Sequence, residues 1–231
     1  MLNIGQTSFD ISVPSLPADE FEFYSTNLFD VWEKEIKKAM SFGDYAISLE
    51  VEEGSIKGKG KIAVAAGVLY FGIGNYGDFI GGLEAIYSQV TYIGEQLFQS
   101  AKSPVGGNSV RATKRTNAGA VSTMRRLFEG VRSGSLSVDQ AMEEFEKMLG
   151  DELPENADFV KEMRGQLEAA PSYPEQLSLV QDDWEEGELL EPPRSPRSPR
   201  PKPTPPQEQL RIEIWRESKN DRKHVKFTKA Q

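Results

Sequence analysis

The feature that most constrains this chain is a long segment near its C-terminus that cannot build a core. Residues 171–209 are first acidic and then rich in proline, and they include the run Pro192-Pro193-Arg194-Ser195-Pro196-Arg197-Ser198-Pro199. Such a composition favours a disordered or polyproline II segment, because it offers few side chains to bury. We therefore expect 171–209 to be a disordered linker between a folded part and a C-terminal tail.

The first hundred residues carry the patterns of an α+β domain. Strict alternation of apolar residues over 45–52 predicts a strand, and shorter alternating stretches at 9–13 and 56–61 predict two more. Apolar residues three and four apart predict a helix over 19–40, with acidic residues near its start and lysines near its end. We assign 1–100 to this small strand–helix domain.

A Gly-rich apolar segment, 62–99, completes the N-terminal domain. Ile62 to Gly77 form a run of 16 residues without a charge, which predicts a Gly-rich helical hairpin with a kink at 75–77. The glycines expected to allow close helix packing or membrane contact are Gly67, Gly72, Gly74, Gly77 and Gly81. A spanning helix needs roughly 20 residues, so a buried hairpin is the leading interpretation. A spanning helix and an amphipathic segment that inserts when triggered are the two alternatives.

The same segment has the spacing G-x-G-x-x-G at Gly72, Gly74 and Gly77, which is typical of dinucleotide-binding loops. The run before it is rich in alanine and glycine rather than β-branched residues, and no parallel strand is predicted after it. Helix kinking and close packing account better for these glycines. Nucleotide binding therefore ranks third among the functions considered.

Two further segments precede the linker. Residues 101–118 are interpreted as a basic linker, and 119–170 as a small helical module in which Ser137 and Gln140 form a capping box and Gly150 ends a helix. Residues 101–138 carry a net charge of +6, whereas 139–191 carry −14. We expect the basic helix to pair with the chain's own acidic segment. Nucleic acid is disfavoured as a partner, because the basic block lacks interleaved aromatic residues.

The tail, 210–231, regains the alternation of β-strands around a turn. A lone two-stranded hairpin is barely stable in water, so we expect the tail to dock on a sheet edge of the N-terminal domain or of a partner. The candidate partner-binding residues are Leu210, Ile212, Ile214, Val225 and Phe227.

The residue inventory excludes several kinds of chemistry. The chain has no cysteine, and its one histidine is His224, so disulfides, thiolate metal sites and cysteine nucleophiles are ruled out. We predict no catalytic residue, no cofactor and no metal site, and therefore no enzyme. The N-terminus has no signal-peptide pattern, which favours a cytoplasmic protein; entry of 62–99 into a bilayer would make it a peripheral or inner-membrane protein.

Two short motifs carry a resemblance to a known class of proteins. A predicted strand ends in Glu52-Glu53-Gly54-Ser55-Ile56-Lys57, and a Gly-rich apolar helix follows with Asn75-Tyr76-Gly77-Asp78-Phe79. Over about residues 40–100 this resembles small accessory and effector-associated proteins of bacterial conflict (anti-phage) systems. The resemblance implies an accessory or effector role beside a sensor protein.

The leading function is a non-catalytic interaction or adaptor subunit whose partner is another protein, a sensor or effector subunit. The first alternative is a membrane-perturbing effector that acts through 62–99, and a nucleotide-binding module is the second. Self-association and membrane contact remain open as further interactions.

Overall fold

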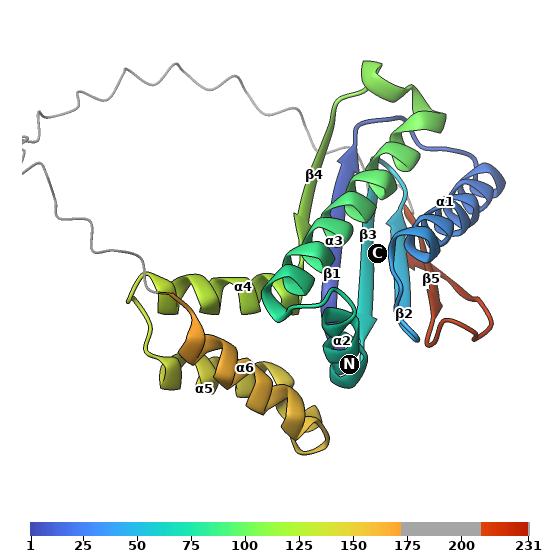
Figure 1. The fold of residues 1–231 in the computed structure, drawn as a ribbon. Coiled ribbons are helices and arrows are strands. Elements are labelled where there is room, and N and C mark those ends of the chain that lie inside the picture. Colours follow the sequence, from blue (N-terminus) through green and yellow to red (C-terminus); the bar gives the residue numbers. More distant parts are fainter. Residues whose placement is uncertain (172–208, 231) are drawn as a thin grey trace, which may run out of the picture.

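The computed structural model describes residues 1–171 and 209–230, and it shows one six-stranded antiparallel sheet with helices (Figure 1). The strands are β1 (Leu2–Ile11), β2 (Ala46–Glu52), β3 (Ile56–Val64), β4 (Ala112–Asn117), β5 (Gln209–Arg216) and β6 (His224–Ala230). The helices are α1 (Ala18–Ala39), α2 (Ala66–Gly74), α3 (Phe79–Lys102), α4 (Gly119–Arg132), α5 (Val138–Leu149) and α6 (Ala157–Ala169). The expected α+β class is confirmed. The predicted linker lies, apart from its two end residues, outside the described residues.

The strands follow the order β4-β1-β3-β2-β5-β6, and the two faces of the sheet differ in chemistry. On β2 the buried residues are Ile47, Leu49 and Val51, while the residues between them are partly exposed. On the partly exposed face Glu50 lies opposite Lys59 on β3. Cross-strand pairs of opposite charge stabilise a face that meets water, as is common in antiparallel sheets.

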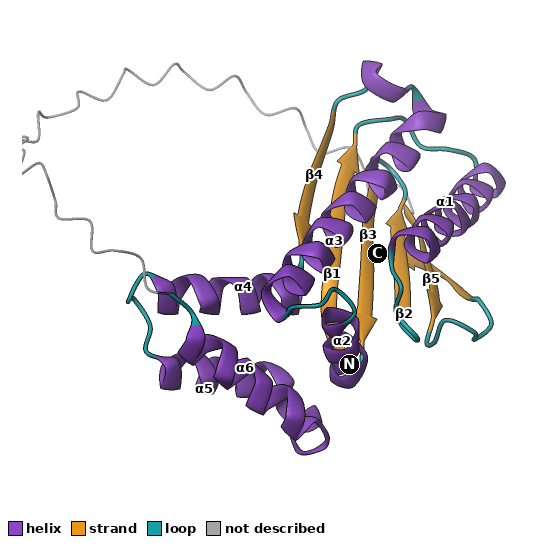
Figure 2. Ribbon diagram, in the orientation of Figure 1, coloured by secondary structure: helices purple, strands orange, loops and turns teal. Residues whose placement is uncertain are grey.

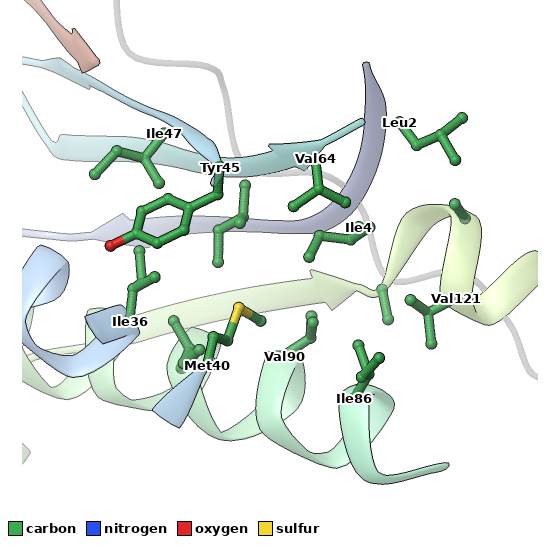
Figure 3. Close-up of a cluster of buried hydrophobic side chains, with 14 of the residues drawn as sticks. Leu2, Ile4, Ile36, Met40, Tyr45, Ile47, Val64, Ile86, Val90 and Val121 are labelled. Carbon is green, nitrogen blue, oxygen red and sulfur yellow. The ribbon is translucent and has the colours of Figure 1, made fainter. Parts of the chain in front are cut away.

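The apolar face is covered by α1 and α3, which lie side by side across it (Figure 2). Figure 3 shows Met40, just after α1, and Val90 of α3 among the buried side chains of the sheet, including Val64. Gly60 on β3 permits this close layer: a Cβ there would lie 2.6 Å from Leu97 Cδ2 and 2.9 Å from the Trp32 ring. The glycine that weakens the strand by propensity therefore makes room for both helices.

The helical module shares one core with the sheet domain. The ring of Phe159 on α6 lies 5.1 Å from that of Phe145, 5.1 Å from that of Tyr70 on α2, and 6.1 Å from that of Phe79 on α3. The predicted capping box of α5 is present, and Gly150 has φ +54 after that helix. Because these rings join several elements, no break in the core marks the expected boundary at residue 100.

Two predicted segments differ from the structure. The expected basic linker 101–118 contains β4, an edge strand paired with β1, because backbone hydrogen bonds hold it without an apolar pattern. Lys114 at its middle forms an ion pair with Glu95 and lies over the Phe98 ring. The helix expected from residue 62 begins instead at Ala66, since β3 continues to Val64.

Candidate protein-interaction surface

The C-terminal hairpin docks on the chain's own sheet. Strand β5 pairs antiparallel with β2, so that Ile212 lies opposite Val51 and Ile214 opposite Leu49. Ile212 and Ile214 are buried in the core, and Leu210 packs against it as a partly buried residue. These three predicted partner-binding residues therefore bind within the chain and are not available to another protein.

Ion pairs on both faces of the sheet join β5 to β2 and to α1. Arg211 on β5 forms ion pairs with Glu50 and Glu52 of β2, on the water-facing side of the sheet. On the helix side, Arg216 Nε lies 3.0 Å from Oε1 of Glu33 on α1. Glu33 is only 5% exposed, so Arg216 compensates a carboxylate that water barely reaches.

The turn of the hairpin is held by two more acidic residues. Lys223 Nζ lies 2.7 Å from Asp30 Oδ1 on α1, and the backbone N–H of Lys219 donates to Asp44 Oδ1 at 2.8 Å. That hydrogen bond holds the pKa of Asp44 below its ordinary value. These contacts hold the turn between β5 and β6 against α1 and against the loop that follows α1.

The two remaining predicted residues stay exposed on the outermost strand. Phe227 lies opposite Ile212 and Val225 opposite Ile214, which places both on the apolar face of the sheet. Yet Phe227 is 51% exposed and Val225 39% exposed, although their cross-strand neighbours are buried. The apolar face therefore continues onto β6 beyond the cover of the helices in the described part of the chain.

A further exposed aromatic residue, Phe23, lies on α1, the helix that contacts the hairpin turn. It precedes Asp30 by seven residues, or two helical turns, and so shares the stripe of α1 that faces the hairpin. Its side chain is 74% exposed. Because Asp30 on this stripe pairs with Lys223 of the hairpin, we group Phe23 with Val225 and Phe227 and call the three residues the edge patch. Phe23 was not predicted from the sequence. The helical spacing of α1 could have indicated it, because Phe23 lies outside the buried stripe that includes Phe21 and Tyr24.

The opposite edge of the sheet is β4, and its composition differs from that of β6. Strand β4 has the sequence ATKRTN, with Lys114 and Arg115 at its centre and no large apolar side chain. Lysine and short strands are usual means of keeping an edge from associating. Strand β6 also carries two lysines, Lys226 and Lys229, but it adds Val225 and Phe227 on the apolar face, and an exposed apolar surface beside polar residues is typical of an interaction site.

The predicted packing glycines have different roles. A Cβ on Gly72 would lie 2.3 Å from the Phe42 ring, one on Gly67 would lie 3.2 Å from Asn156 Oδ1, and one on Gly81 would lie 2.7 Å from Asp78 Oδ2. Gly77 has φ +89 in the turn before α3, whereas Gly74 has nothing close to it. An unpredicted glycine, Gly82, marks a close approach of α3 to α2, since a Cβ on it would lie 2.2 Å from the Ile73 carbonyl oxygen.

The structure gives little support to the alternative functions, nucleotide binding and membrane insertion, that were considered for 62–99. Gly72 and Gly74 lie in the last turn of α2, so the G-x-G-x-x-G spacing follows a helix rather than the strand that a dinucleotide loop requires. Helix α2 has nine residues, and among the described helices none is long and apolar enough to cross a bilayer. Leu69 and Ile73 of α2 are buried, while Phe71 is 75% exposed.

The only histidine, His224, lies at the start of β6. Its ring stacks on Trp215 with centroids 5.2 Å apart, and Nε2 lies 3.3 Å from Asp221 Oδ2. The pair with His224 and the backbone N–H of Arg222 together keep the pKa of Asp221 below its ordinary value, the backbone hydrogen bond contributing most.

The sequence matches no protein-family model, and no curated protein or solved structure is significantly similar to it.

Proposed function

We propose that the chain is a non-catalytic interaction subunit that binds a partner protein through the edge patch. The observation that carries the proposal is the exposure of Phe23, Val225 and Phe227 at the uncovered end of the sheet. Covering these side chains would remove apolar surface from water, at about 25 cal/mol per Å². This is the usual driving force of stable protein association.

The geometry favours an amphipathic helix as the partner element. Helices pack about 10 Å apart, which is close to the width of two strands, so one helix covers roughly two strands of a sheet. Helix α1 packs against β2 and β5, which leaves β6 as the next position on the same face. A partner helix beside α1 would place its apolar stripe on Phe227 and Val225 and its flank against Phe23.

The resemblance to accessory proteins of bacterial anti-phage systems agrees with a module that acts through a partner. The position of the only histidine also supports a non-catalytic role, because His224 stacks on Trp215 and pairs with Asp221 within the hairpin. A sensor or effector subunit that presents an amphipathic helix is the partner we propose.

The test is affinity capture from the source cells with the full chain as bait, followed by mass spectrometry. Three baits are compared: the wild type, Phe227→Glu in the edge patch, and Phe71→Glu as a control on an exposed phenylalanine of α2. We expect a partner that is retained by the wild type and by Phe71→Glu but lost with Phe227→Glu. Hydrogen exchange of the reconstituted complex should then show protection in β6 and in one helix of the partner.

Circular dichroism of each bait controls for folding. If the three baits retain the same proteins, the edge patch is not the binding surface. Steady turnover of nucleotide, nucleic acid or NAD by the purified chain would contradict the non-catalytic assignment.

A further inference from the structure

A concave surface separate from the edge patch lies between α3, α4 and the end of α6. It encloses about 660 Å³, and its lining includes Ile80, Tyr87, Arg125, Phe128, Ala170 and Pro171. We call it the α3–α4 groove. A volume of this size can accept several side chains of a peptide.

The floor of the groove is apolar, and its rim carries three arginines and two glutamates, Arg125, Arg126, Arg132, Glu84 and Glu129. Ile80 of α3 is 38% exposed, and the ring of Phe128 lies below the surface beside it. On the rim, the Arg125 guanidinium stacks 3.8 Å from the centre of the Tyr87 ring and donates to Glu84 Oε1 at 2.6 Å. This stacking and pairing hold the guanidinium in place at the edge of the apolar floor.

The chain itself continues from this groove. Pro171, the last residue described before the linker, is part of the lining, so the residues after it begin at the site. Residues 172–191 carry seven acidic side chains and no basic one. Their apolar residues include Tyr173, Leu177 and Leu179, which precede the densest acidic run. The segment thus has apolar groups for the floor and carboxylates for the rim.

We propose that residues 172–191 dock in the α3–α4 groove of their own chain. Leu177 is six residues from Pro171, and an extended chain spans at most about 3.4 Å per residue, so the apolar residues reach the groove without strain. A short tether gives the segment an effective concentration in the millimolar range, which makes even a weak site occupied. The charges are complementary at α4, because Arg125, Arg126 and Arg132 line the groove and the segment carries seven carboxylates.

The experiment separates the segment from its groove within a full-length chain. In one protein residues 172–191 are replaced by a Gly/Ser sequence of equal length, and a fluorescein-labelled synthetic peptide of 172–191 is titrated against it by fluorescence anisotropy. We expect saturable binding that weakens as salt rises. The unaltered chain should bind the peptide at least tenfold more weakly, because its own segment occupies the groove.

Two variants of the Gly/Ser-replaced protein locate the site. Ile80→Glu places a charge on the apolar floor and should abolish peptide binding, whereas Tyr92→Glu, on an exposed residue of α3 outside the groove lining, should leave it unchanged. Circular dichroism confirms that both variants fold.

Three results would overturn the proposal. The first is that the Gly/Ser-replaced protein does not bind the peptide. The second is that it binds the peptide no better than the unaltered chain does, which would leave the groove for an external acidic peptide. Equal loss of binding in Ile80→Glu and Tyr92→Glu would place the binding elsewhere.

Discussion

The ion pair between Arg216 and Glu33 should control how firmly the C-terminal hairpin is docked. Arg216→Met keeps most of the length of the side chain and removes its charge, which leaves the Glu33 carboxylate without its hairpin partner. Breaking a fully buried pair in this way costs about 3–5 kcal/mol. Two features reduce the cost here: Lys37 Nζ remains 2.8 Å from Glu33, and the Arg216 side chain is 21% exposed. We therefore expect a loss of about 2 kcal/mol.

The assay is hydrogen exchange followed by mass spectrometry, because it resolves the hairpin from the rest of the fold. A loss of about 2 kcal/mol raises the population of the undocked hairpin roughly 30-fold, so exchange in 209–230 should accelerate by that factor. Amides of α5 that exchange by local opening, with the hairpin still docked, should not change their rate. The free energy of global unfolding from urea titration should fall by the same amount of about 2 kcal/mol, because the ion pair is absent in the unfolded chain too.

Lys223→Met provides the matched control at the neighbouring pair. Asp30 and Lys223 are more exposed, with side-chain exposures of 43% and 25%, so their pair should contribute less than about 1 kcal/mol. The reasoning is refuted if Lys223→Met and Arg216→Met accelerate hairpin exchange equally. It is also refuted if amides of the hairpin and of α5 exchange with the same free energy of opening, since the hairpin would then not open on its own.

Three further predictions concern other parts of the fold. Gly82→Ala should destabilise the protein by about 1–3 kcal/mol, because its Cβ meets a carbonyl oxygen, whereas Gly74→Ala has open space and should be neutral or stabilising by up to about 1 kcal/mol; urea unfolding compares them. Ser137→Ala removes the capping box of α5 and should cost about 1 kcal/mol in the same assay, with no loss if the cap is dispensable. Asp44 has a lowered pKa, so its contribution is present above its unfolded pKa of about 3.9 and is lost as pH falls through its folded value. Asp44→Asn should therefore be less stable than the wild type at pH 7 and equally stable well below pH 4, and a difference that persists at low pH would contradict the assignment.

Much of the fold could be predicted from local sequence patterns. Strand β2 alternates apolar and polar residues strictly, and α1 repeats apolar residues at helical spacing, because each element has one buried side and one wet side. Strand β4 could not be found in this way. It is held by pairing with β1, and its side chains have no alternating apolar pattern that would predict a strand.

Only part of the candidate site could be predicted from the sequence. Val225 and Phe227 stand out by alternation, but so do Ile212 and Ile214, and only the pairing of β5 with β2 separates buried from exposed residues. The contact of Arg216 with Glu33 joins residues 183 positions apart, and no spacing rule relates residues at that distance. Tertiary structure alone therefore assigns each residue of the tail to the core or to the surface.

The ion pairs of Arg211 with Glu50 and Glu52 have a consequence for synthesis on the ribosome. Chains grow from the N-terminus at about 5–20 residues per second, so roughly 45 residues after α6 delay the completion of β5 by about 2–9 s. During that interval β2 is an open edge beside other nascent chains on the same message. Two copies of β2 would bring Glu50 and Glu52 of one chain against those of another, and this repulsion opposes their pairing. The edge of β2 therefore remains unpaired until β5 is synthesised and Arg211 neutralises Glu50 and Glu52.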